Sequence, residues 1–509
     1  MKKNFDAVNW EGYLPQPICE EFPQYGEFYK KAWELARMHV RAIPGMPQSP
    51  YMDEGFCNTQ VWIWDSCFMS LFCKYAQEVF PGVETFANFY EVLYNGKSLP
   101  MILPMENEPK WTGAKPNEPF SIKVHIADNP PLFAWAEYEN ALIHGDKEYV
   151  KELLYKKQSL QRHYDWLEGL TEKKKLKNVH CSTHWLVEKY GYKWECGVSG
   201  MDNTPRGRRE TPAKEERPNN PDMLWLDGIC QQALSANSIA KLFRLVDDEE
   251  NASEWEKKFL EKKEIVNRFY WDNEDKFYYD IDCNDLHFYK VKTIASYWTL
   301  TSGIASKIQA QALVDLTSDP ETFGGDVPLV SLARKDVDFS KTGKYWRGSL
   351  WLPTAYAALK GMAEYGFYEE AHTAAHKIFK HMLKTYTNYE PHTVWEAYSP
   401  KEACPARKPN DEDIVRKDFC GWSALGPISI YLEYVLGFHT VNAFEKVVEW
   451  AKPMGFKGKI GVRNLRFGEI ITDIIAEGKR CFVTTNYPYC LKINGKAFML
   501  SVGENEIEL

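Results

Sequence analysis

The sequence lacks long apolar runs and dense basic clusters, and each absence excludes a class of partner. No uninterrupted apolar stretch approaches ~18 residues, so we expect no membrane span. Lysine and arginine never form a block longer than three residues, and the formal net charge is −9. Because binding to phosphates needs a basic face, we expect no nucleic-acid partner.

The sequence also shows neither closely spaced cysteine pairs nor the features of a secretory leader. The 12 cysteines are scattered without a C-x-x-C pair, so we expect reduced thiols rather than disulfides. The ligand spacing of a zinc site is absent, and we expect neither a metal nor a cofactor. The amino-terminal MKKNFDAVNWEGYLPQP has no apolar stretch behind its lysines, so no secretory signal is expected and the cytoplasm is the expected location.

Helical periodicity dominates the first 440 residues. Apolar residues recur at helical spacing, with Gly145 as an expected C-cap and Asp146 as the next N-cap in ALIHGDKEY. In a long chain of helical hairpins, closing the hairpins into a ring is one way to bury every apolar face, so we expect an (α/α) barrel. The helices are expected at 27–40, 65–79, 131–143, 147–167, 223–245, 254–269, 305–316, 350–365, 368–386 and 421–436.

The last part of the chain has a different pattern. From about Val441, short runs such as EIITDIIAEG and RCFVTTNYPYCLKING alternate polar and apolar residues, and Asn494-Gly495 is a hairpin turn signal. We therefore expect a mainly α protein with two domains. We expect residues 1–440 to form a helical domain and residues 441–509 to form a small antiparallel β domain without chemistry of its own.

Aromatic residues make up 15% of the chain and include 18 tryptophans, many of them in loops. For a single tryptophan, core packing is the ordinary explanation. Several loop tryptophans beside carboxylates and arginines favour a sugar site, because a sugar has apolar C–H faces and a rim of hydroxyls.

One loop, GVSGMDNTPRGRR at 197–209, carries Asp202 in a setting of Gly, Asn and Pro that fixes the backbone shape. A second stretch, TVWEAYSP, holds Glu396 between Trp395 and Tyr398. Partial desolvation between aromatic rings raises the pKa of a carboxyl group, which suits a general acid or base. A buried glutamate paired with an arginine explains Glu396 equally well.

The ordered motifs WIWDS, DNPP, SGMDNTPR, FGGDVP, YWRG, VWEAYSP and CGWSALGP resemble the clan of trehalases and glycoside hydrolase family 63. The resemblance covers about residues 58–438 and is greatest to bacterial α-glucosidases and to mannosylglycerate and glucosylglycerate hydrolases. It implies an inverting exo-glycosidase on an (α/α)6 barrel. An α-linked glucoside or mannoside, as an oligosaccharide or a glycosyl-glycerate, is the implied substrate.

The resemblance also implies roles for single residues. Asp202 corresponds to the general acid and Glu396 to the general base of an inverting pair, whose carboxyl groups lie ~6.5–9.5 Å apart. Arg206 is further expected to order the acid loop. The implied substrate contacts are Trp62, Trp64, Asp65, Asn129, Asn203, Arg206, Trp346, Arg347, Trp351, Tyr398 and Trp422.

Three departures from the family pattern concern the aglycone side. The usual S-Q-P-P is D-N-P-P here, Ser349 follows Y-W-R-G where proline is common, and an insertion extends to about Arg416. Arg208 and Arg209 are additional to the motif. They either hold an anionic aglycone such as glycerate or are solvated charges that balance nearby glutamates.

Two alternatives remain open at the level of the sequence. A sugar epimerase on the same barrel would use histidines as proton shuttles, and His125, His180 and His184 are the candidates. A non-catalytic carbohydrate-binding protein would keep the aromatic residues without needing both Asp202 and Glu396. In each case the expected partner is a small carbohydrate, and formation of a homo-oligomer is left open.

Overall fold

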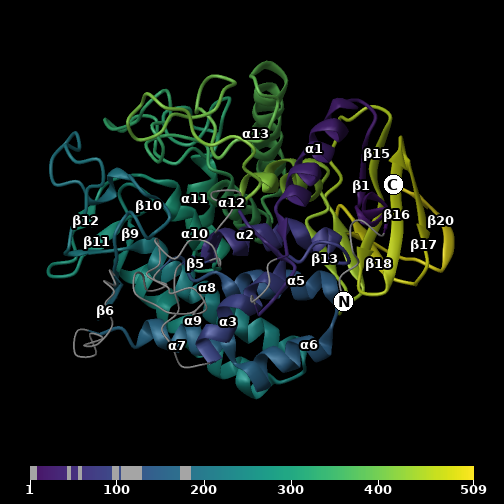
Figure 1. The fold of residues 1–509 in the computed structure, drawn as a ribbon, viewed down its shortest axis with the longest axis horizontal. Helices are drawn as coiled ribbons and strands as arrows, with labels where there is room; N and C mark the ends of the chain where they lie inside the picture. Colours follow the sequence, from purple (N-terminus) through teal and green to yellow (C-terminus); the bar gives the residue numbers. More distant parts are fainter. Residues whose placement is uncertain (1–7, 43–46, 55–59, 95–101, 105–128, 172–184) are drawn as a thin grey trace.

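The computed structural model describes residues 8–42, 47–54, 60–94, 102–104, 129–171 and 185–509. The chain is mainly helical, with mostly antiparallel sheets at its carboxyl-terminal end and along one flank (Figure 1). Across these ranges, none of the helices combines the length and apolarity that a membrane span needs. His125, His180 and His184 lie outside the described residues.

Six helices contact one another in a closed cycle. α2 packs on α5, α5 on α8, α8 on α10, α10 on α12, α12 on η9, and η9 returns to α2. Every residue of α2 and of the π-helical η9 is buried, which is the pattern of a helix that is apolar all round. These inner helices are α2 (Ile63–Cys73), α5 (Phe133–His144), α8 (Leu226–Leu245), α10 (Trp298–Thr301), α12 (Leu352–Glu364) and η9 (Gly426–Val435).

Amphipathic helices cover the inner helices from outside. α9 packs along α8, and α13 packs on both α12 and η9. Their buried residues follow helical spacing, as the sequence predicted. The outer helices are α1 (Gln24–Met38), α3 (Ala87–Tyr94), α6 (Lys147–Lys151), η4 (Glu152–Lys157), α7 (Ser159–Glu168), α9 (Glu249–Phe269), α11 (Lys307–Asp315) and α13 (Tyr368–Asn388).

The turn between α5 and α6 confirms the expected caps. Gly145 has φ 67°, and its N–H donates to the carbonyl of Ala141. The Asp146 side chain accepts the N–H of Tyr149 at 2.9 Å. The short single turns are η1 (Trp10–Tyr13), η2 (Lys74–Ala76), η3 (Val83–Phe86), η6 (Pro205–Gly207), η7 (Ile294–Tyr297) and η8 (Ser423–Leu425).

Two sheets form the carboxyl-terminal end of the chain (Figure 1). The larger has the order β1-β15-β16-β17-β20, so Gln16–Cys19, from near the amino terminus, completes it. The smaller, β13-β14-β18-β19, includes one parallel pair, β14 with β18, beside its antiparallel pairs. The strands are β1 (Gln16–Cys19), β13 (Thr440–Asn442), β14 (Val447–Trp450), β15 (Lys459–Phe467), β16 (Ile470–Glu477), β17 (Arg480–Thr485), β18 (Cys490–Ile493), β19 (Lys496–Met499) and β20 (Gly503–Glu508).

A further sheet, in the order β12-β11-β8-β7-β6, lies among the helices and was not predicted. Its strands have two or three residues each, which is too short for alternation to be recognised. They are β6 (Leu186–Glu188), β7 (Gly191–Lys193), β8 (Met223–Leu224), β11 (Asp280–Asp282) and β12 (Phe288–Tyr289). The remaining pairs are β2 (Val40–Arg41) with β3 (Tyr51–Met52), β4 (Gln60–Trp62) with β5 (Ile102–Pro104), and β9 (Trp271–Asp272) with β10 (Phe277–Tyr278).

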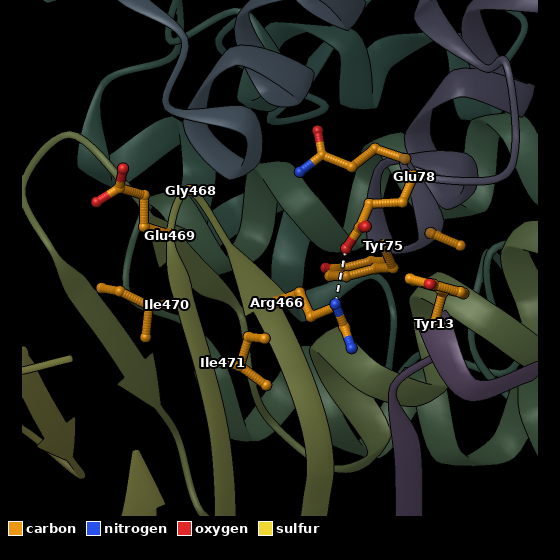
Figure 2. A pocket seen from close by; sticks show the side chains of 10 residues that line it. Tyr13, Tyr75, Glu78, Arg466, Gly468, Glu469, Ile470 and Ile471 are labelled. Carbon is orange, nitrogen blue, oxygen red and sulfur yellow. Dashed lines mark hydrogen bonds and ion pairs between the residues drawn. The ribbon is translucent and has the colours of Figure 1, made fainter. Parts of the chain in front are cut away.

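The seam between the helices and the larger sheet contains a cavity of about 260 Å³ (Figure 2). Arg466 of β15 reaches across it to Glu78, with 2.7 Å between Nη1 and Oε1. The same guanidinium lies over the ring of Tyr13, 5.0 Å from its centroid. The sheet is therefore tied to the helical part by polar contacts as well as by apolar packing.

Candidate active site

The sequence-predicted site residues gather where the inner helices begin. Trp62 precedes α2, Asp65 lies in its first turn, and Asn129 precedes α5. Trp351 is the N-cap of α12, and Trp422 is the N-cap of the turn that leads into η9. Because these helices all start at the same end, segments distant in the sequence meet there.

The loop that carries Asp202 depends on a glycine for its path. Gly200 has φ 85°, and a Cβ at this position would lie 2.4 Å from the Trp64 ring. Only glycine combines that backbone angle with so close an approach. The Asp202 side chain keeps 30% of its surface accessible, whereas Trp64 is buried. The acid loop therefore lies directly against the tryptophan at the start of α2.

Arg206 anchors this loop from behind. It is buried and forms ion pairs with Asp227 and Asp280, at 2.7 and 2.5 Å. Its Nη1 also lies 3.8 Å from the sulfur of Met201, the residue before the acid. The structure thus places the guanidinium in the wall beneath the loop, in the position expected of a residue that orders it.

Asn203 joins the acid loop to the segment that contains Trp346. Its side-chain oxygen Oδ1 accepts the backbone N–H of Trp346 at 2.7 Å, and its side-chain nitrogen Nδ2 donates to the backbone carbonyl of Lys344 at 3.0 Å. Arg347 donates to the backbone carbonyl of Asn203 at 3.2 Å and to that of Glu215 at 2.7 Å. In this structure Asn203 and Arg347 fix the two loops to each other.

Glu396 is held by hydrogen-bond donors. Its Oε1 accepts from Tyr345 Oη at 2.8 Å and from Arg416 Nη1 at 2.6 Å, and its Oε2 accepts the backbone N–H of Arg416 at 3.0 Å. Its backbone carbonyl accepts the indole N–H of Trp422 at 2.9 Å. The side chain is only 1% exposed. Glu396 is consequently fixed as an acceptor, and the arginine partner that the sequence left open is Arg416.

Three carboxyl groups influence one another in this region. Burial raises the pKa of Asp202 to about 7, with Arg217 lowering it and the charge of Glu396 raising it further. Burial also raises the pKa of Asp65 to about 8, and the charges of Glu396 and Asp202 add to the effect. A carboxyl group with a pKa near neutrality can donate a proton at neutral pH, as a general acid must.

Four tryptophans pack around these carboxyl groups. Trp346 and Trp351 are stacked, with ring centroids 4.2 Å apart and an interplanar angle of 3°. Trp422 lies 5.7 Å from both Trp64 and Trp351, and Trp64 lies 6.5 Å from Trp346. The four come from three separate segments and form one aromatic cluster. Trp351 is fully buried, so it braces the cluster rather than contacting a sugar as predicted, and only Trp64 and Trp422 keep more than a trace of accessible surface.

Three further predicted residues, Asn129, Tyr398 and Trp62, have different surroundings. Asn129 donates to the carbonyl of Val198 at 2.9 Å, while its buried Oδ1 accepts no hydrogen bond from the described residues. The Tyr398 hydroxyl accepts the backbone N–H of Trp395, so this ring braces the Glu396 segment. Trp62 is partly buried at the end of β4.

Of the two arginines beyond the acid, Arg208 fits neither predicted alternative, whereas Arg209 is exposed as a solvated charge would be. Arg208 donates to both Asp336 and Asp338 at 2.6 Å, so it neither balances the neighbouring glutamates nor stands open to an anion. The cation beside the acid is instead Arg217, whose Nη2 lies 3.8 Å from Asp202 Oδ2.

Sequence reasoning missed three residues that contact the two carboxylates, namely Arg217, Tyr345 and Arg416. Arg217 lies in a polar loop, and Arg416 lies in the insertion that departs from the family pattern. Tyr345 directly precedes Trp346, and it is the one member of this set that the Y-W-R-G motif could have indicated.

One group of side chains has the spacing of a metal site. In the described part of the chain, ligand atoms of Asp282, Asp285 and His287 lie within 4.8 Å of one another. The latter two are exposed and pair with each other at 2.6 Å. Exposed acidic groups of this kind are common without an ion, so the absence of a metal stays a prediction.

Comparison with known proteins gives the family. Residues 58–412 match the model of the mannosylglycerate hydrolase MGH1-like glycoside hydrolase domain. An uncharacterized protein of Borreliella burgdorferi is 27% identical over 358 residues, which are 69% of this chain and 68% of that protein. The mannosyl-oligosaccharide glucosidase of Saccharomyces cerevisiae is 26% identical over 311 residues, or 55% of this chain and 34% of that protein. This chain thus matches about a third of the length of the yeast enzyme.

A solved structure supports the same conclusion for the fold. The family 63 mannosylglycerate hydrolase of Thermus thermophilus, crystallised with glucose, superposes with a TM-score of 0.58 at 18% identity. The superposition covers 79% of this chain and 99% of that one. With the family model spanning more than half of its residues, the chain belongs to the MGH1-like glycoside hydrolases and is a glycosidase.

Proposed function

We propose that this glycosidase is an inverting, exo-acting enzyme that cleaves an α-linked glucoside or mannoside, with Asp202 as general acid and Glu396 as general base. The observation that carries the proposal is the contrast between the two carboxyl groups. Burial and the charge of Glu396 raise the pKa of Asp202 to about 7, while both oxygens of the Glu396 carboxylate accept hydrogen bonds, from Tyr345 and Arg416. A carboxyl group whose surroundings raise its pKa is assigned as the acid, and a carboxylate held by hydrogen-bond donors is assigned as the base.

In this mechanism Asp202 gives its proton to the glycosidic oxygen as the bond to the leaving group breaks. Glu396 accepts a proton from the water that attacks the opposite face of the sugar. Tyr345 and Arg416 hold the base in one orientation, and Arg416 stabilises the charge that the base carries before the proton arrives. Trp64 and Asp65 are proposed to contact the sugar, and Trp346 and Trp422 to bound it.

The cycle of contacts from α2 through η9 supports an (α/α)6 barrel as the scaffold, with residues 1–440 as catalytic domain and 441–509 as β domain. β1 modifies that division, since this amino-terminal strand belongs to the β sheet. A cytoplasmic location, expected from the scattered cysteines of the sequence, stays a proposal.

Glycosyl-glycerates and α-linked disaccharides are the proposed substrates. A Thermus relative named for mannosylglycerate supports the former, and Arg217 beside the acid supplies a cation where a leaving group would stand. Screening the purified protein against both classes and measuring the released monosaccharide tests the proposal. Release from neither class would contradict it.

The two carboxylates are tested by Asp202→Asn and Glu396→Gln. Each removes one proton transfer, so each should reduce kcat by at least ~10²–10⁴-fold while the Tm stays within a few degrees of the wild type. Glu402→Gln, an exposed glutamate six residues after the base, is the matched control and should retain full activity. A variant that kept more than about a tenth of the activity would remove its residue from the mechanism.

A further inference from the structure

The inner helices end around a second polar cavity, at the opposite end from Asp202. This floor cavity has a volume of about 400 Å³. Its lining includes Lys74 after α2, Glu139 of α5, Lys241 of α8 and Lys360 of α12, together with residues of β13. The helices whose first turns lie at the candidate active site therefore line this cavity with their last turns.

The two sites are separate. Nine residues of helix, from Asp65 to Lys74, span about 13 Å. The space between is filled by packed rings, since Phe68 lies 5.3 Å from Trp64 and 6.1 Å from Trp135, and Trp135 lies 6.3 Å from Tyr356. A sugar bound near Asp202 cannot reach the floor cavity through this wall.

Charges on the floor of the cavity form a chain in which each group has an opposite partner. Lys74 lies 3.2 Å from Glu433 and 3.5 Å from Glu139, and Lys360 lies 3.0 Å from Glu139 and 3.8 Å from Glu364. Glu433 is not part of the lining but pairs with Lys74 from behind it. Counting Glu433, the three lysines and three glutamates of this region balance. A neutral ligand therefore fits this lining better than an anion or a cation does.

The lining also offers flat apolar surfaces and unused hydrogen-bonding capacity. The ring of Tyr368 stacks on the imidazole of His439, with centroids 4.5 Å apart. Lys241 makes no ion pair with a described residue, and its ammonium lies 5.2 Å from the centroid of the Tyr138 ring. Ammonium groups donate up to three hydrogen bonds, and a carboxylate accepts about four. Alternating donors and acceptors beside aromatic faces suit a ligand with many hydroxyls and apolar C–H faces.

We propose that the floor cavity is a second, non-catalytic carbohydrate site that binds a neutral mono- or disaccharide. Its volume lies in the range of small-molecule sites. The ligand lies across Tyr138 and Tyr368, with Lys241 and the side chains of β13 at its rim. This inference does not depend on the proposed reaction, because no residue of the floor cavity belongs to the catalytic set.

The test combines soaked crystals with calorimetry of the full chain, using D-glucose, D-mannose and trehalose as probes. We expect density for at least one probe in the floor cavity. The variant K241M/Y368A removes the two rim contacts and keeps the ion pairs of Lys74 and Lys360, so it should fold. It should weaken sugar binding in the floor cavity at least about tenfold, with hydrolysis unchanged, because the sugar loses a hydrogen bond from a charged group and an aromatic contact.

The matched control is K257M/Y155A, which removes an exposed lysine and an exposed tyrosine from outer helices. It should bind as the wild type does. Water alone in the cavity, binding of inorganic phosphate in place of the sugars, or equal affinity in K241M/Y368A and the control would overturn the proposal. If the substrate screen fails but a probe occupies the floor cavity, the reaction is misassigned and the second site stands.

Discussion

At the scale of single residues, the account depends on how the surroundings of Asp202 set its pKa. Burial raises the value to about 7, and Arg217 lowers it. A general acid must be protonated, so kcat/KM should fall as the pH rises through about 7. Asp65 belongs to the same cluster of interacting carboxyl groups. The fall of kcat/KM at alkaline pH therefore reflects the whole cluster rather than Asp202 alone.

Replacing Arg217 with methionine removes the charge that opposes the raised pKa. The alkaline limb of the kcat/KM profile should then move to higher pH. Arg209→Met, which removes an exposed arginine of the same region, should leave the limb where it is. A limb that moves to lower pH in Arg217→Met, or moves equally in both variants, would contradict this account of the acid.

Asp65 provides a test of stability. Its folded pKa of about 8 lies well above the ordinary value of 3.8, so its stabilising contribution is complete at low pH and is lost as the pH rises through about 8. Asp65→Asn cannot ionise. Its Tm relative to the wild type should therefore be higher at pH 8 than at pH 5, with activity reduced. Calorimetric scans at the two pH values measure this, and a Tm difference independent of pH would refute it.

At the scale of elements, the acid loop is positioned by the space that Gly200 leaves for Trp64. Gly200→Ala adds a methyl group 2.4 Å from that ring and should lower kcat by roughly tenfold or more, because small displacements of catalytic groups are costly. Gly366→Ala is the matched control. Gly366 has nearly the same φ, 86°, but no atom lies near its Cβ position. Both variants carry the backbone strain, and only Gly200→Ala should lose activity.

The elements also show what the sequence could predict. The long helices followed from periodicity, and the turn at Gly145 and Asp146 followed from capping chemistry. The sheet that contains β8 and β11 did not, because two- or three-residue strands carry no readable period. That sheet nevertheless matters, since β11 supplies Asp280 to Arg206.

The candidate site was predictable where a motif carried it and not elsewhere. Asp202, Glu396 and the tryptophans stand in recognisable motifs and meet in space. Arg217 and Arg416 lie outside the motifs, and only the folded chain brings them to the carboxylates. The role suggested for Arg208 failed because Asp336 and Asp338, far along the chain, pair with it.

At the scale of the whole molecule, the inner helices divide the protein into two ends with different chemistry. Their first turns bring carboxyl groups and tryptophans together, and their last turns carry a balanced chain of buried ions. The β sheets close the second end through β13. Oligomeric state stays a prediction, as does the choice between a glucoside and a mannoside.

The most direct test of the central claim is the configuration of the sugar at the moment it is released. An inverting pair delivers water to the face opposite the leaving group. Proton NMR of the first product from an α-linked substrate should therefore show the β anomer before mutarotation produces the α form. An α anomer released first would mean a retaining mechanism, and Asp202 and Glu396 could not then act as the acid and base described.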